Sequence, residues 1–291
     1  MKMKKYIPLL LMLALMAGTV ACSAKKDLAE STNEAAGTTT EYPLTGFARL
    51  AASGIVHIEL TQGSVESVRV VESPNPNLLT KVEKRGDELY IYTKALKKNL
   101  NINGDESPVA YVTMRNIAGI DLRGATHLST SSLQTGDLTV SVSGATKLKA
   151  DYLHSDNLKM TCSGASDMNI SKAEFGKLKM TCSGASKMAA TLRGDDVDID
   201  NSGASKADLT VDARVMEMDN SGASKSNIRF KGRRLQVSNT GAGKIDIDTD
   251  CEELSATNSG AAKFTIKGTA DKTDIQASGV SKINTSGLNR F

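Results

Sequence analysis

The stretch Ser183-Gly184-Ala185-Ser186-Lys187 recurs unchanged at residues 202–206 and 221–225, and altered copies of it run through more than half of the chain. Successive copies are 20 residues apart three times and then 19 residues apart five times, with their glycines at Gly124, Gly144, Gly164, Gly184, Gly203, Gly222, Gly241, Gly260 and Gly279. A period this regular is typical of a solenoid, in which each repeat is one structural unit stacked on the previous one.

Within each repeat, apolar residues alternate with polar ones. In one repeat, for example, Leu158, Met160 and Cys162 are separated by Lys159 and Thr161. Alternation with a period of two indicates a β-strand that buries one of its faces. Because equivalent residues recur in columns, we predict an all-β protein, a parallel β-helix with coils of 19–20 residues. A series of β-hairpins is the alternative.

One column of the predicted interior is polar. The residues two positions before the glycines are Leu122, Val142, Cys162, Cys182, Asn201, Asn220, Asn239, Asn258 and Ala277. Buried amides are costly unless they are hydrogen-bonded, so we expect the four asparagines to form a stacked amide ladder. A polar channel or an interior ligand site is the alternative. In the same column, we expect Cys162 and Cys182 to be inward-facing free thiols.

The clearest surface feature is a column of basic residues three positions after the glycines. Its members are His127, Lys147, Asp167, Lys187, Lys206, Lys225, Lys244, Lys263 and Lys282. The last six are a candidate binding face for an anionic glycan or a lipid head group. The alternative is that these lysines only protect the sheet from lateral association.

The N-terminus has the features of an export signal. Lys2, Lys4 and Lys5 precede an apolar run over residues 7–20 that is short for a membrane span, and Cys22 follows a small residue. This end resembles a bacterial lipobox, so we predict a lipoprotein signal peptide over residues 1–21 and lipidation of Cys22. An ordinary signal peptide is the alternative.

A polar segment rich in Ser, Thr, Ala and Glu follows the signal. We predict that residues 22–43 are a flexible tether and that residues 44–291 form the β-helix domain. Within this domain, residues 44–118 would form irregular coils and residues 119–291 the regular ones. We expect the last residues, Ser286–Phe291, to fold back as a cap over the end of the helix.

Charge argues against a nucleic-acid partner. The chain has 36 basic and 33 acidic residues, and three of the basic ones belong to the predicted signal. The exported part is therefore formally neutral, without the basic excess that nucleic-acid binding requires.

Several stretches together resemble a known family. They are the repeated Ser-Gly-Ala-Ser phrases, residues 53–63 (SGIVHIELTQG), residues 85–93 (RGDELYIYT) and the lipobox at Cys22. The chain is similar over about residues 44–290 to bacterial lipoproteins of the DUF2807 family, described as an auto-transporter adhesin, head GIN domain. The resemblance implies a right-handed parallel β-helix and an adhesin-like role.

Candidate catalytic groups are few. The three histidines, His57, His127 and His154, lack metal-ligand spacing and accompany no nucleophile motif. The weak candidate for a metal site or a carboxylate pair is the patch of Asp198, Asp200, Glu217 and Asp219. We expect a charge-balanced surface there instead, neutralised by Lys206 and Lys225. We predict no catalytic residues, no bound metal and no cofactor.

These observations favour an exported protein that is anchored through Cys22 to the cell envelope, at the outer membrane, and acts as an adhesin or binding module without catalysis. Its partners would be the membrane, through the anchor, and a surface glycan or a protein ligand. One alternative is a carbohydrate-active β-helix enzyme, a polysaccharide lyase or hydrolase. Another is a structural spacer of the envelope without a specific ligand.

Overall fold

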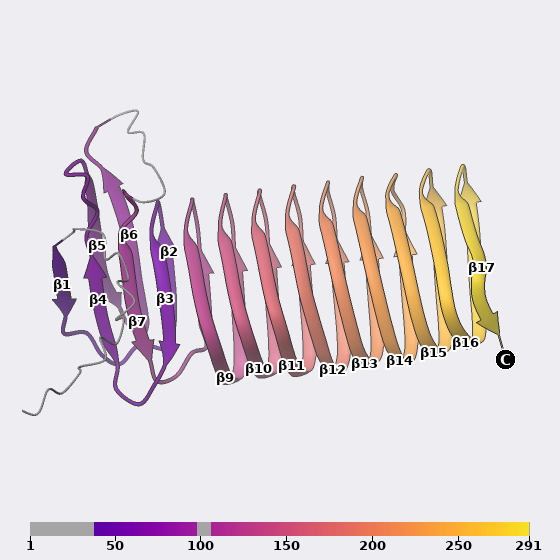
Figure 1. Ribbon diagram of the computed structural model, residues 1–291, viewed down its shortest axis with the longest axis horizontal. Coiled ribbons are helices and arrows are strands. Elements are labelled where there is room, and N and C mark those ends of the chain that lie inside the picture. The colour runs from indigo at the N-terminus through magenta and orange to yellow at the C-terminus, as the bar shows by residue number, and fades with distance from the viewer. Residues whose placement is uncertain (1–37, 98–105, 291) are drawn as a thin grey trace, which may run out of the picture. The chain divides into compact units, whose positions relative to one another are not determined.

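The computed structural model describes residues 38–97 and 106–290, in which 17 β-strands form one continuous sheet (Figure 1). From residue 127 onward, each repeat is one coil of a parallel β-solenoid. The strands of these coils are β9 (His127–Val142), β10 (Lys147–Cys162), β11 (Asp167–Cys182), β12 (Lys187–Asn201), β13 (Lys206–Asn220), β14 (Lys225–Asn239), β15 (Lys244–Gly260), β16 (Lys263–Gly279) and β17 (Lys282–Arg290). The predicted fold class, an all-β parallel helix, is confirmed.

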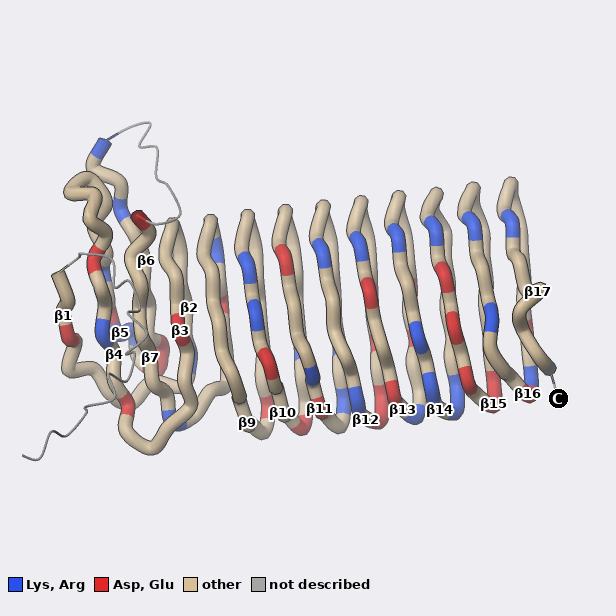
Figure 2. The backbone as a smooth tube through the Cα atoms, in the orientation of Figure 1, with Lys and Arg blue, Asp and Glu red and all other residues tan. Residues whose placement is uncertain are grey.

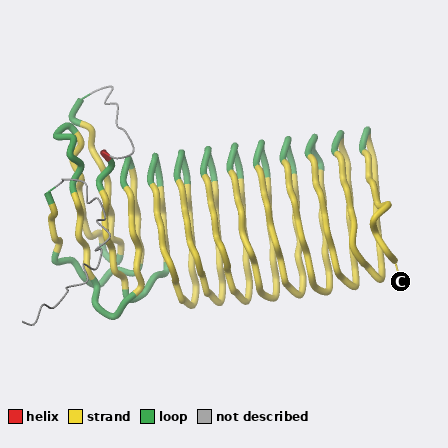
Figure 3. Tube along the Cα trace, viewed as in Figure 1, coloured by secondary structure: helices red, strands yellow, loops and turns green. Residues whose placement is uncertain are grey.

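The coils stack in register. Lys187 of β12 pairs with Lys206 of β13, and Lys206 pairs in turn with Lys225 of β14. Nearly all of each coil is strand, and short loops at one end mark the Ser-Gly-Ala turns (Figure 3). Every sequence column is therefore a physical row of side chains, with neighbours separated by about 4.8 Å, the spacing of hydrogen-bonded strands.

The N-terminal strands are less regular. They are β1 (Thr39–Tyr42), β2 (Arg49–Ser53), β3 (His57–Gln62), β4 (Ser67–Val71), β5 (Leu78–Arg85), β6 (Glu88–Ala95), β7 (Val109–Met114) and β8 (Gly119–Leu122). β2 pairs in parallel with β8, and β3 with β9, so the segment around Gly54 stacks directly on the coil of Gly124.

β6 pairs in parallel with β2, and β7 with β3, on the edges opposite to β8 and β9. Other N-terminal strands pair antiparallel. β4 pairs antiparallel with β1 and β7, and β5 and β6 form an antiparallel pair. The prediction of irregular coils over residues 44–118 misses these antiparallel pairs. The folded part also begins earlier than predicted, because residues 39–42 of the expected tether form β1.

The chain end differs from the predicted cap. Residues 282–290 continue the solenoid as β17, which pairs in parallel with β16 and brings Leu288 opposite Gly268. Despite a register shift between Thr265 and Lys267, this parallel pairing gives the backbone groups of β16 partners that a chain folded across the end would not supply. Phe291 lies outside the described residues.

Inward-facing residues form a core that continues from coil to coil. In β10, for example, Leu148, Ala150, Leu158 and Met160 are buried, whereas Lys159 between them is exposed. The alternation read from the sequence therefore gives the correct inward face. Cys162 and Cys182 are buried free thiols of this core, as predicted. A hydrogen bond with Cys162, together with burial, raises the pKa of the Cys182 thiol.

The asparagine column forms the predicted amide ladder. The side-chain amide of Asn201 donates to Asn220 at 2.9 Å, Asn220 donates to Asn239 at 2.8 Å, and Asn239 donates to Asn258 at 2.9 Å. The last amide donates to the carbonyl of Ala262 at 3.2 Å. The asparagines are at most 2% exposed, so these amides bond to one another in the core rather than lining a channel.

Replacing Asn220 with alanine should destabilise the solenoid. The change leaves the Asn201 amide without its acceptor, and it also removes the acceptor of the Ser224 hydroxyl, which donates to Asn220 at 2.7 Å. We expect a loss of roughly 1–3 kcal/mol in the free energy of unfolding, measured by denaturant titration. Asn169→Ala is the control, because Asn169 is exposed on β11. Equal losses in the two variants would contradict the ladder.

Each Ser-Gly-Ala turn depends on its glycine for two reasons. Gly184 has a φ of 81°, in the left-handed region that residues with a Cβ avoid. A Cβ added there would also lie 2.6 Å from the carbonyl oxygen of Gly164 in the coil before. The glycines therefore stack backbone against backbone, which allows the close approach of successive turns.

We expect Gly184→Ala to lower the free energy of unfolding by at least about 2 kcal/mol, since it combines a left-handed alanine with a steric overlap. Thermal or denaturant unfolding followed by circular dichroism measures the loss. Gly136→Ala is the matched control, because an added Cβ there meets only the Asp156 carboxylate, at 3.8 Å. A Gly184→Ala variant as stable as this control would show that the coils can separate at little cost.

Candidate binding face

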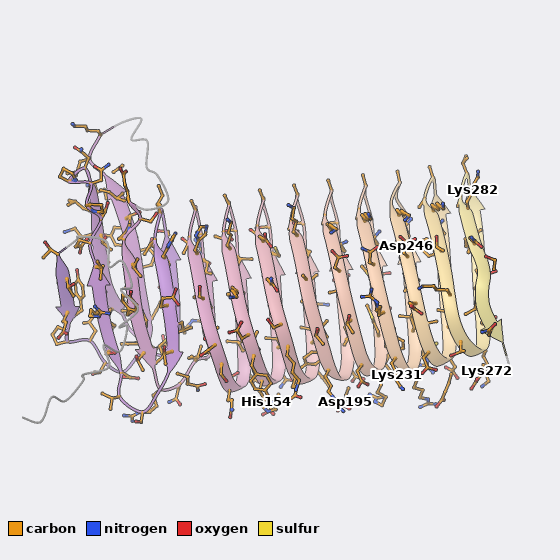
Figure 4. The ribbon with its side chains drawn as sticks, viewed as in Figure 1. His154, Asp195, Lys231, Asp246, Lys272 and Lys282 are labelled. Atoms are coloured by element: carbon orange, nitrogen blue, oxygen red, sulfur yellow. The ribbon has the colours of Figure 1, made fainter. Side chains whose placement is uncertain are left out.

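The basic column consists of Lys187, Lys206, Lys225, Lys244, Lys263 and Lys282. All six lysines are exposed and lie opposite one another in adjacent strands. Figure 2 shows basic segments in a row close to the Ser-Gly-Ala turns, and Lys282 is labelled at the end of this row in Figure 4. The predicted column is thus a continuous feature of one solenoid face.

Like charges one strand apart repel each other, and acidic neighbours offset part of this repulsion. Lys206 forms an ion pair with Asp208 at 2.7 Å, and Lys244 forms one with Asp246 at 2.5 Å. Hydrogen bonds from Lys206 and from Asn227 lower the pKa of Asp208. Within residues 38–97 and 106–290, the other four lysines of the column have no ion pair.

A groove lies beside the basic column on β13 to β16. It has a volume of about 300 Å³, and its polar lining comes from Asp208, Asn227, Arg229, Asp246, Asp248, Thr265 and Lys267. Asp246 is labelled in Figure 4, closer to the Ser-Gly-Ala turns than His154 and Lys231, which project from the opposite, broader turns. The sequence predicts the lysines but not this groove, which depends on the side-chain sizes in four adjacent coils.

The acidic patch lies on the other half of the coil. Asp198 pairs in register with Glu217, and Asp200 with Asp219, so the four carboxylates are neighbours as predicted. The expected neutralisation by Lys206 and Lys225 is wrong.

Lys179 of the preceding coil supplies the positive charge to the patch instead, at 2.9 Å from Asp198 and 3.8 Å from Asp200. The reason is that the Ser-Gly-Ala turn reverses the chain, which carries Lys206 to the opposite face, where it binds Asp208. In the part of the chain that the structure describes, no group of three or more His, Cys, Asp or Glu residues is arranged to hold a metal ion.

Two histidines that are far apart in sequence are stacked in the structure. The ring centroids of His57 and His127 are 4.6 Å apart, with 28° between the ring planes. The sequence contains the signal for this contact, because each histidine stands three residues after a turn glycine, Gly54 or Gly124. The pair extends the row of basic positions to β3.

Burial lowers the pKa of both imidazoles. Lys147, in the next coil, lowers both values further, and the pKa of His127 is also lowered by His57. Glu59 acts in the opposite direction on His57. At neutral pH the pair is therefore uncharged, and protonation would place two positive charges close together beside Lys147.

The stacked pair predicts a loss of stability in mild acid. Unfolded histidines titrate near pH 6.5, above the folded values, so the unfolded chain binds more protons as the pH falls below about 6.5. The melting temperature should fall between pH 7 and pH 5, and by less in the double variant His57→Gln/His127→Gln. His154→Gln, at an exposed position, is the control. An unchanged pH profile in the double variant would contradict the prediction.

The predicted signal peptide over residues 1–21 and the predicted lipidation site, Cys22, lie outside the described residues. A helix that is long and apolar enough to cross a membrane does not occur among the residues that the structure describes.

The fold and the exposed basic column define a β-solenoid repeat protein with a polar surface that repeats from coil to coil. The family described as "Putative auto-transporter adhesin, head GIN domain" (DUF2807) matches residues 46–218 and 213–290. The chain belongs to this family, as its sequence motifs predict.

Solved structures with a similar fold include proteins from two Parabacteroides species. A protein of Parabacteroides merdae described as a putative adhesin has a TM-score of 0.56 and 13% identity, over 81% of this chain and 95% of that one. A second such protein, from Parabacteroides distasonis, has a TM-score of 0.53 and 13% identity, over 86% and 98% of the two chains. At this identity the likeness concerns the fold alone. A search of curated proteins finds no match.

Proposed function

We propose that this protein is exported, anchored through a lipid on Cys22 to the cell envelope at the outer membrane, and acts there as a non-enzymatic adhesin or binding module. The lipobox-like sequence before Cys22 supports the anchor. Membership of a family described as an adhesin supports the binding role. The segment after Cys22 would act as a tether that holds the solenoid, and with it the binding face, away from the membrane.

The observation that carries the binding role is the register of the basic column. Lysines at the same position in six successive coils form a straight row whose spacing is set by backbone hydrogen bonds, not by flexible loops. Such a row suits a ligand whose own groups repeat along a line, as in a polysaccharide or an extended peptide.

The enzymatic alternative has less support. A glycosidase of the usual type needs a free carboxylate pair flanking its substrate, one of them with a raised pKa. Asp198 and Asp200 are instead paired with Lys179. The third possibility, a spacer without a ligand, differs from the binding module only in whether the exposed face binds anything.

Binding can be separated from turnover with a glycan array and the full chain in mild detergent. We expect the chain to bind a subset of immobilised glycans and to release no reducing or unsaturated sugar from them. A variant with all six lysines of the basic column changed to glutamine should bind at least about tenfold more weakly, a difference of about 1.4 kcal/mol. Release of sugar would favour the enzyme, and the absence of binding on both glycan and protein arrays would favour the spacer.

The anchor is tested independently by metabolic labelling with a fatty-acid analogue. The label should enter the wild-type chain and fractionate with membranes, and Cys22→Ala should lose both the label and the membrane association. A labelled Cys22→Ala variant would contradict lipidation at this residue.

A further inference from the structure

The basic column is not uniform over β13 to β16, because the residue two positions after each lysine alternates in character. This residue is Asp208 on β13 and Asp246 on β15, whereas it is Asn227 on β14 and Thr265 on β16. The side chain two positions along a strand lies on the same face, about 7 Å away, within reach of a lysine. Alternate lysines therefore have an acidic residue two positions along their own strand, and the others do not.

The ion pairs follow this alternation. Lys206 and Lys244 are bound by their own aspartates, at 2.7 Å and 2.5 Å. Lys225 and Lys263 have no ion pair within the described ranges, and both are exposed. The two unpaired ammonium groups stand two coils apart, which corresponds to about 10 Å between their backbone positions.

The groove beside these lysines adds a third unpaired cation. Arg229 lines the groove and has no ion pair among the residues described, whereas Lys267 is paired with Asp248 at 3.0 Å. The groove also offers hydrogen-bond acceptors in its aspartates and a neutral amide and hydroxyl in Asn227 and Thr265. A ligand in this groove would meet both fixed positive charge and acceptors for its own hydroxyl groups.

We propose that the groove on β13 to β16, together with Lys225 and Lys263, binds an acidic polysaccharide. This inference rests on the proposed binding function and names the ligand class. The carboxylate or sulfate groups of the polymer would contact Lys225, Arg229 and Lys263, since charged partners give the stronger hydrogen bonds. The sugar hydroxyls would donate to the aspartates that line the groove.

Two features favour a polysaccharide over an anionic membrane surface. The groove is lined by three carboxylates, Asp208, Asp246 and Asp248, which can accept hydrogen bonds from sugar hydroxyls, whereas a lipid surface presents mainly phosphate acceptors. Lys225 and Arg229 on β14 are also separated from Lys263 on β16 by the ion-paired coil of β15, so the unpaired cations do not form one dense patch. A polymer with acidic groups at intervals along a hydroxyl-rich backbone fits both features.

The test uses the full chain in mild detergent and four probes: oligogalacturonate, dextran sulfate, neutral dextran and vesicles containing phosphatidylglycerol. The double variant Lys225→Gln/Lys263→Gln removes the two unpaired lysines. The matched control is Lys159→Gln/Lys177→Gln, which removes the same two charges from exposed positions of β10 and β11, outside both the groove and the basic column. Circular dichroism melting checks that both variants fold.

We expect oligogalacturonate or dextran sulfate to bind in preference to neutral dextran, with an affinity that falls as salt is added. The groove variant should lose at least about tenfold in affinity, and the control less than about twofold, because two charge-assisted contacts are removed only in the first. Arg229→Gln should weaken binding in the same direction.

Three results would overturn the proposal. Equal losses in the groove variant and the control would mean that diffuse charge, not the groove, attracts the polymer. Binding to the vesicles alone would indicate a membrane surface. Failure of both anionic polymers to bind would exclude the ligand class, while the binding function would survive if the glycan or protein arrays still showed a ligand.

Discussion

The stacking of one turn glycine on the next is the constraint on which the rest of this structure depends. At Gly144, Gly164 and Gly184, an added Cβ would fall 2.6 Å from the carbonyl oxygen of the preceding glycine. The turns can therefore approach to the strand spacing only if this column has no side chains. Once it is filled by glycine, the backbone of each coil can follow that of the previous one, and all other columns come into register.

Strict register restricts which residues the interior of the solenoid can accept. A single inward position is repeated in every coil, so a polar residue there is acceptable only if its neighbours above and below can bond to it. The asparagines meet this requirement because an amide carries both donors and an acceptor, so each can donate to the next and accept from the previous one. Cys162 and Cys182 occupy the same column in earlier coils as small apolar residues.

The same register determines the outer surface. A lysine at one repeat position becomes a row of lysines, and the acidic residues two positions later decide which members of the row are neutralised. The electrostatics of this face therefore follow from a short pattern read across coils: an aspartate on β13 and β15, and an uncharged residue on β14 and β16. Binding by such a surface relies on repetition and spacing more than on a deep pocket.

The sequence alone determined the solenoid, the inward columns and the row of lysines, because all three follow from the fixed period and do not depend on the details of side-chain packing. It missed what depends on distant segments meeting: the stacking of β2 and β3 on the first regular coil and the antiparallel strands beside them. The His57–His127 contact was also missed, although the equal spacing of both histidines from a turn glycine carries its signal. It also assigned the wrong cation to the acidic patch, since only the direction of the chain after each turn shows that Lys179, not Lys206, faces Asp198. The groove on β13 to β16 is likewise a tertiary feature, because its shape is set by side chains of four coils that no local pattern brings together.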